Sequence, residues 1–490
     1  MNSLATRRAG ILLHLTSLPG AGMCGTLGPE AYRFVDFLAA AGQSVWQFLP
    51  VGPTHDDGSP YQCLSLHAGN PLYISAEQLA SAGWLEGSVQ PPKTPAEQGA
   101  MLERAYLGFL QSAGDADRRH FSEFITANGH WLEDYALYVV LREANHHATW
   151  VEWPAALRDR DPAALQTAQH QYEEGLQRVR FEQFVFYRQW QSLKDHANRQ
   201  GIALFGDLPI FVAHDSADVW AQQDYFQLDD RGQPTVVAGV PPDYFSATGQ
   251  RWGNPHYRWD RMQQDGFQWW VVRFKTQFQL FDLVRIDHFR GFESYWEIPA
   301  DHDTAMGGRW VQAPGDALFE MLRRHFDPLP VVAEDLGVIT PDVEALRIRH
   351  GLPGMKILQF AFDGGPGNPY LPHNHHHLAV VYTGTHDNDT TLGWYNSLPM
   401  EARRHVDEYL HCAGEAMPWP LIRTALASVA TLAVIPLQDV LALGSEHRMN
   451  TPGRPDGNWR WRFSWDQVQP TMASQLRHVS DLYGRIPPRT

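Results

Sequence analysis

The sequence predicts a (β/α)8 barrel, a fold in which eight parallel strands alternate with helices. Eight short apolar runs recur along the chain, each bounded by Gly, Pro or a polar turn. Runs that are apolar at every position suit parallel strands buried on both faces. A doubly wound sheet would give a similar pattern, but eight units favour a closed barrel. The predicted strands are residues 11–15, 45–50, 202–205, 283–286, 331–333, 357–362, 380–382 and 432–436.

Helical patterns lie between many of these strands and support the alternation. Residues 31–41 follow the first strand, residues 267–279 precede the fourth, and residues 341–349 follow the fifth. The gap between the second and third strands is about 150 residues, which is too long for one crossover. Three segments inside it carry apolar side chains at i, i+3 and i+4, so we expect a helical insertion. They are residues 96–113, 131–144 and 162–197.

A second insertion separates the third and fourth strands. Residues 212–262 are rich in Trp, Tyr, Pro and Gly, which favours an ordered loop over the site. After Asp387 the sequence predicts a helix, a strand, a Trp-rich loop and a last helix, so we expect no C-terminal β-sandwich domain. The predicted division is a barrel start at 1–75, a helical insertion at 76–198, the third barrel strand at 199–211, an insertion over the active site at 212–265 and the rest of the barrel at 266–490.

The composition excludes several kinds of partner. The 490 residues include 39 Lys and Arg against 55 Asp and Glu, which gives a formal net charge of −16. Nucleic acids and anionic membranes require clustered basic side chains, so we expect neither. The longest apolar stretch, residues 425–443, is interrupted by polar residues and is a poor membrane span. The 3 cysteines form no disulfide pattern, which favours a reducing, cytoplasmic location.

Three of the predicted strands are followed by acids. Asp287, Glu334 and Asp387 come after the fourth, fifth and seventh apolar runs. A single acid in such a place is most simply a solvated loop residue, but the strand ends of a barrel meet at the face that carries the chemistry. Retaining cleavage of a glycosidic bond needs two carboxyl groups, one as nucleophile and one as acid and base. Arg285 shares a strand face with Asp287, where its charge would keep Asp287 ionised.

Longer motifs around these acids resemble one family. RIDHFRGF (285–292), AEDLG (333–337) and YTGTHDNDT (382–390) follow one another along the chain. Further segments extend the pattern nearly from end to end, including HLTSLPG (14–20), SPYQ (59–62), GDLPIFV (206–212), GVPPDYFS (239–246), GQRWGNP (249–255) and PGRPDGNW (452–459). Together they resemble the amylomaltases, the 4-alpha-glucanotransferases (disproportionating enzymes) of glycoside hydrolase family 77 in the alpha-amylase clan.

The resemblance implies a role for each acid, with Asp287 as the nucleophile, Glu334 as the acid/base and Asp387 as the transition-state stabiliser. It also implies that a further set of side chains binds the glucan, either around the reactive sugar or in loops that close over it. These are Ser59, Tyr61, Asp207, Tyr244, Phe245, Trp252, Arg285, His288, His386 and Asn458.

The activity implied by the resemblance is the transfer of α-1,4-glucan segments between maltooligosaccharides or starch-type glucans, and to glucose, by double displacement. A hydrolase of the alpha-amylase type uses the same intermediate and stays an alternative, as does a non-catalytic glucan-binding protein. We expect neither a cofactor nor a metal. The His-rich segment 372–377 is interpreted as a polar loop, and Asp229 and Asp230 lack the spaced acids of a calcium loop.

Overall fold

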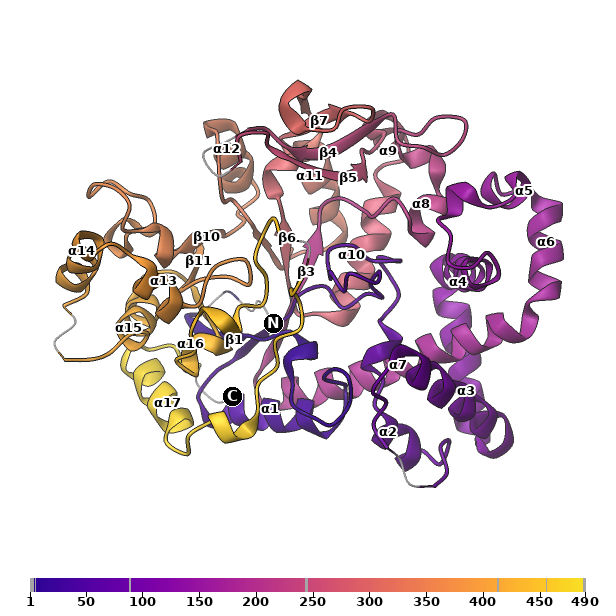
Figure 1. Ribbon diagram of the computed structural model, residues 1–490, viewed down its shortest axis with the longest axis horizontal. Coiled ribbons are helices and arrows are strands. Elements are labelled where there is room, and N and C mark those ends of the chain that lie inside the picture. The colour runs from indigo at the N-terminus through magenta and orange to yellow at the C-terminus, as the bar shows by residue number, and fades with distance from the viewer. Residues whose placement is uncertain are drawn as a thin grey trace.

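The core of the molecule is an eight-stranded parallel sheet that curls into a barrel (Figure 1). The computed structural model describes residues 4, 6–87, 90–242, 246–411, 414–454 and 456–487. The strand order is β10-β11-β12-β1-β2-β3-β6-β9. The N–H of Ala333, at the end of β9, donates to the carbonyl of Pro353, just before β10, at 2.8 Å, which joins the two edges. The (β/α)8 prediction is therefore confirmed. The strands are β1 (Arg8–Leu12), β2 (Val45–Gln47), β3 (Ala203–Pro209), β6 (Leu283–Asp287), β9 (Val331–Ala333), β10 (Gly354–Ile357), β11 (Ala379–Tyr382) and β12 (Leu432–Pro436).

The sixth predicted strand was wrong in its position. The apolar run 357–362 was expected to be the strand, but β10 ends at Ile357, and Leu358–Phe360 forms a 3-10 turn. Leu358 is fully buried although it lies outside the sheet, because the turn packs against the barrel core. Apolar character alone cannot separate a buried strand from a buried turn. The first strand also begins three residues earlier than predicted, at Arg8.

Helices surround the barrel where the sequence predicts them. Helix α12 begins at Pro341, after Thr340 accepts a hydrogen bond from the N–H of Val343 as its N-cap. The predictions for 31–41, 267–279 and 341–349 are confirmed, each within two residues at either end. The helices on this layer are α1 (Pro29–Ala40), α10 (Gln268–Leu280), α11 (Gly315–His325), α12 (Pro341–Arg349), α13 (Thr391–Ser397), α14 (Met400–Leu410), α15 (Trp419–Ala427), α16 (Leu437–Val440) and α17 (Met472–Leu482).

The long gap after β2 is helical, as predicted. It contains α2 (Ala76–Ser81), α3 (Pro95–Ser112), α4 (Asp115–Ala144), α5 (Ala155–Arg158), α6 (Pro162–Gln171) and α7 (Glu173–Arg199), most of which lie to one side of the barrel in Figure 1. The segment 162–197 is two helices rather than one, because the chain leaves the helical conformation at Tyr172. Two buried amides of α7 accept backbone hydrogen bonds, Gln183 from Gly69 and Gln189 from Ser75, both at 2.8 Å. They fix the chain that leaves the β2 loop.

A second, antiparallel sheet was not predicted. Its strands are β4 (Val236–Val240), β5 (Gln250–Pro255), β7 (Ser294–Pro299) and β8 (Arg309–Gln312), in the order β5-β4-β7-β8. Two of them come from the insertion after β3 and two from the connection after β6, so the pairing joins separate loops. The insertion also holds α8 (Ala217–Ala221) and α9 (Trp259–Gln264). In Figure 1 this sheet lies above the barrel near β6.

Across the described part of the chain, none of the helices is both long enough and apolar enough to span a bilayer. The C-terminal residues are held to the barrel by Arg485, which is fully buried. Its guanidinium donates to the carbonyls of Leu426 at 2.6 Å, Arg8 at 2.8 Å and Ser428 at 2.8 Å. One side chain thus joins the end of the chain, α15 and the first barrel strand.

Replacing Arg485 by Met should lower the free energy of unfolding by about 2–4 kcal/mol, because several buried carbonyls would lose their donor. Urea unfolding followed by Trp fluorescence measures the change. The matched control is the exposed Arg324→Met, which should stay within about 0.5 kcal/mol of the parent protein. Equal stability of the two variants would contradict this role of Arg485.

Candidate active site

The three predicted acids come together at the carboxyl ends of the barrel strands. Asp287 is the last residue of β6, Glu334 follows β9 directly, and Asp387 lies in the loop after β11. The side chains of Asp287 and Asp387 are 32% and 47% exposed, so both face open space rather than the packed barrel interior. A substrate can therefore reach them.

A buried guanidinium holds the base of the site. Arg285 on β6 lies directly opposite Asp207 on β3 in the parallel pairing of these strands. It donates to both carboxylate oxygens of Asp207, at 2.8 and 2.7 Å, and to Oδ1 of Asp287 at 2.7 Å. Burial lowers the pKa of Arg285, but the two carboxylates outweigh this effect and leave its pKa well above the usual value. The arginine therefore stays charged beside Asp287.

Glu334 is in a different environment. Its carboxyl group accepts the backbone N–H of His288 at 2.7 Å and that of Leu336 at 2.9 Å. Removal of water, followed by the negative charge of Asp287, raises the pKa of Glu334 to about 7. Burial is the larger of these two causes. The carboxyl group of Glu334 therefore holds a proton more readily than an ordinary glutamate does.

Asp387 is held in place by its neighbours. His386 Nε2 lies 3.3 Å from Oδ2 of Asp387 and 2.9 Å from the hydroxyl of Tyr61. Burial alone would lower the pKa of His386, but the carboxylate of Asp387 outweighs this and leaves it above the usual value. Desolvation would raise the pKa of Asp387, but His386 and a hydrogen bond from Asn450 hold it well below its usual range. Asp387 is thus a fixed, charged acceptor.

Comparisons with known proteins show which family the chain belongs to. The sequence model of the family described as 4-alpha-glucanotransferase matches residues 13–468. The chain belongs to the 4-alpha-glucanotransferase family. It is 50% identical to the 4-alpha-glucanotransferase of Thermus thermophilus over 496 residues, which cover 98% of this chain and 99% of the relative. It is 42% identical to the chloroplastic/amyloplastic 4-alpha-glucanotransferase of Arabidopsis thaliana, over 98% and 86% of the two chains.

A solved structure extends the family relationship to three dimensions. The amylomaltase from Streptococcus agalactiae, in complex with acarbose, superposes with a TM-score of 0.94 and 36% identity. The match covers 98% of this chain and 99% of that one. The resemblance to the amylomaltases of glycoside hydrolase family 77 is therefore confirmed along nearly the whole length, and the chain is an enzyme of this group.

Most of the residues predicted to bind glucan surround the acids of this family 77 site. Tyr61 donates to Oδ2 of Asp207 at 2.7 Å, and its ring stacks on that of His386, with centroids 5.3 Å apart. Trp252 on β5 meets the ring of His288 edge-on at 4.9 Å. Burial lowers the pKa of His288 to about 4, so this ring is neutral at pH 7. The antiparallel sheet thus places the indole of Trp252 against His288, the residue that follows Asp287.

Two of the residues predicted to bind glucan, Asn458 and Ser59, make hydrogen bonds within their own loops. The amide of Asn458 accepts the N–H of Thr451 at 2.9 Å and donates to the carbonyl of Arg454 at 2.8 Å, which closes its own loop. The backbone N–H of Ser59 donates to Asp57 at 3.0 Å. A contact of either side chain with glucan stays a prediction. Tyr244 and Phe245 lie outside the described residues.

Two residues that the sequence did not single out also reach the site. Trp459 lies 6.0 Å from the ring of Tyr61 and 6.1 Å from that of His386. Its place at the end of the PGRPDGNW motif, next to Asn458, was a usable signal. Asn450 donates to Asp387 from 63 residues further along the chain, and no local pattern marks it.

The His-rich segment has other partners. His375 contacts the Ser428 hydroxyl at 2.7 Å and the Tyr370 carbonyl at 2.8 Å. His373 contacts the Tyr409 hydroxyl at 2.8 Å. Within the described ranges, no group of three or more His, Cys, Asp or Glu side chains could hold a metal ion. These histidines therefore bridge neighbouring segments around β11.

The protonation of Glu334 gives a testable pH dependence. Glu334 must carry its proton to act as an acid, so kcat/KM on maltotriose should fall about tenfold per pH unit above a pH of about 7. Release of the first fluoride from α-maltotriosyl fluoride needs no acid, so its rate should not decline above a pH of about 7. Stopped-flow fluoride release and maltotriose rates between pH 5 and 9 measure both. The same decline for both donors would exclude Glu334 as the acid.

Proposed function

We propose that this protein transfers α-1,4-glucan segments between maltooligosaccharides or starch-type glucans, and to glucose, with retention of the α-linkage. The observation that carries the proposal is the contrast between two neighbouring carboxyl groups. Asp287 accepts a hydrogen bond from a charged, buried arginine, whereas the pKa of Glu334 is raised to about 7. One group can attack while the other supplies a proton.

The reaction proceeds in two displacements. A carboxylate oxygen of Asp287 attacks the anomeric carbon, the glycosidic bond breaks, and Glu334 gives its proton to the leaving 4-oxygen. The glucan is then held as an ester on Asp287. The 4-hydroxyl of an acceptor glucan attacks the same carbon, its proton passes to the carboxylate of Glu334, and Asp287 is released. Two inversions restore the α-configuration.

Asp387 stabilises the transition state in this proposal. Its carboxylate is anchored by His386 but is 47% exposed, so it can also accept hydroxyl groups of the reacting sugar. Hydrogen bonds to sugar hydroxyls near the reaction centre strengthen as the ring flattens towards the transition state. Tyr61 and Arg285 keep Asp207 and Asp287 in register below that sugar.

Transfer rather than hydrolysis requires that a glucan occupy the acceptor side in place of water. Trp252 from the antiparallel sheet and Trp459 from the loop after β12 bring rings to opposite parts of the site. Indole rings bind sugar faces and exclude water, which favours a second glucan as the acceptor. The partners proposed are therefore α-glucan donors and acceptors. Cys24 and Cys63 are free thiols, in keeping with a proposed cytoplasmic location.

Incubation with maltotriose separates the candidate functions. A transferase should release glucose and build longer maltooligosaccharides, while a hydrolase of the alpha-amylase type should only shorten the chains. Asp287→Ala should lower either activity by at least about 1,000-fold, because the covalent step is lost. The control Asp230→Ala changes an exposed acid far from the strand ends and should be unchanged. Binding of glucan with no products would favour a non-catalytic protein.

Trp252→Ala should raise the share of turnovers that end in water by about tenfold, since stacking on an indole contributes on the order of 1–3 kcal/mol. The hydrolysis-to-transfer ratio on maltotriose is the measurement. Trp310→Ala, which removes a 41% exposed indole from β8, is the matched control and should keep the parent ratio. A uniformly slower Trp252→Ala with an unchanged ratio would mean that the ring only shapes the site.

A further inference from the structure

The carboxylate of Asp387 is held by a segment that is remote in sequence. Asn450, in the loop after α16, donates from Nδ2 to Oδ1 of Asp387 at 2.6 Å. His386 holds the other oxygen, with Nε2 3.3 Å from Oδ2. Among the described residues, each carboxylate oxygen thus has one side-chain partner, which leaves a lone pair for a ligand.

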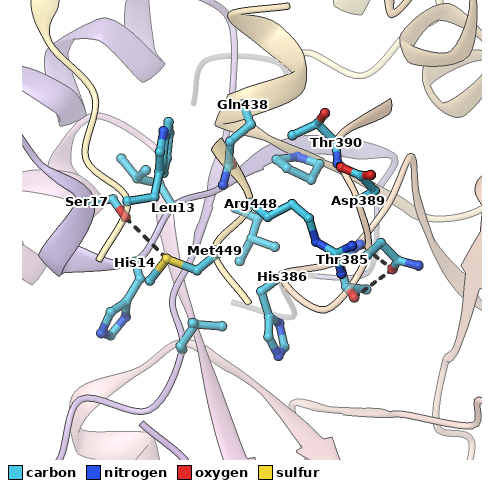
Figure 2. Close-up of a pocket in the computed structure, with 15 residues that line it drawn as sticks. Leu13, His14, Ser17, Thr385, His386, Asp389, Thr390, Gln438, Arg448 and Met449 are labelled. Carbon is cyan, nitrogen blue, oxygen red and sulfur yellow. Dashed lines mark hydrogen bonds between the residues drawn. The ribbon is translucent and has the colours of Figure 1, made fainter. Parts of the chain in front are cut away.

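Arg448 joins the backbones of the two segments. Its Nη2 donates to the backbone carbonyl of Asp387 at 2.9 Å, and its Nε donates to the backbone carbonyl of Asn450 at 3.1 Å. Figure 2 shows the Arg448 side chain extended towards Thr385 in the pocket that His386 and Met449 also line. Arg448 therefore fixes the distance between the backbone at Asp387 and the backbone at Asn450, whose side chain binds the Asp387 carboxylate.

The loop carrying Asn450 is itself anchored. The hydroxyl of Ser445 donates to Oδ2 of Asp389 at 2.7 Å, and Trp461 Nε1 donates to Nδ1 of His447 at 3.2 Å. The N–H of Trp459 donates to the carbonyl of Met449 at 2.8 Å. These contacts lie on both sides of Asn450 in sequence, so its amide is presented to Asp387 from a fixed support.

We propose that Asn450 is a positioning residue for Asp387, with Arg448 fixing the distance between them. The proposal rests on the function proposed above, in which Asp387 accepts hydroxyls of the reacting sugar. Hydrogen bonds that form fully only in the transition state depend on acceptor orientation within fractions of an ångström. A neutral amide can restrain the carboxylate without neutralising it, whereas a cation would compete with the sugar for its charge.

The test uses fluoride release from α-maltotriosyl fluoride. Asn450→Ala should lower kcat about 10- to 100-fold, as expected for loss of a hydrogen bond to a charged group, while KM changes less than about threefold. Asn450→Asp has the same shape but sets a like charge against Asp387, and should lower kcat further. Asn145→Ala removes an amide that bonds to the Leu141 carbonyl at the end of α4, and serves as the matched control.

A double-mutant cycle separates positioning from general loosening of the loop. If Asn450 acts through Asp387, the variant Asp387→Ala with Asn450→Ala should be no slower than Asp387→Ala alone. Full additivity, or a kcat of Asn450→Ala within about twofold of the parent protein, would overturn the proposal. Failure of the proposed function itself would look different, because the parent protein would then form no longer glucans from maltotriose, whether or not it released fluoride.

Discussion

Everything at the strand ends depends on one buried cation. The Arg285 side chain is only 5% exposed, and it is placed between Asp207 on β3 and Asp287 on its own strand. Asp207 is buried, and leaving a buried charge unpaired is destabilising by about 3–5 kcal/mol, so Asp207 needs this partner. The parallel pairing of Asp207 with Arg285 therefore links the register of the barrel to the chemistry of the nucleophile.

The arginine begins a continuous chain of polar contacts. Arg285 donates to Asp207, and Asp207 also accepts a hydrogen bond from the hydroxyl of Tyr61. The same hydroxyl contacts His386, and His386 contacts the carboxylate of Asp387. This chain crosses the loops after β2 and β11 as well as strands β3 and β6, so the two exposed carboxylates belong to one network. Glu334 adjoins this network. Burial is the main cause of its raised pKa, and the nearby charge of Asp287 adds to the effect.

The sequence was sufficient for the barrel and for the position of the three acids at strand ends, because both depend on local patterns. Most of the apolar runs are buried strands, the run 357–362 being the exception, and Asp287 and Glu334 lie at or just after the ends of two of them. The antiparallel sheet and the contact from Asn450 depend instead on pairing between distant segments. β4 pairs with β7 although β6 lies between them in the chain. The composition of a strand does not predict which other strand it pairs with. Such features become visible only when the barrel has placed the loops.

Under the proposed function, the acids on the barrel break the glycosidic bond, and the insertions favour either water or a second glucan as the acceptor. Hydrolases and transferases can share one set of acids, so the scaffold alone does not decide between them. In this chain the antiparallel sheet supplies Trp252, the β2 loop held by α7 supplies Tyr61, and the loop after β12 supplies Trp459 and Asn450. Three separate insertions in the barrel thus converge on the site proposed to bind the sugar. Under the proposed function, these loops set whether water or a second glucan attacks the intermediate.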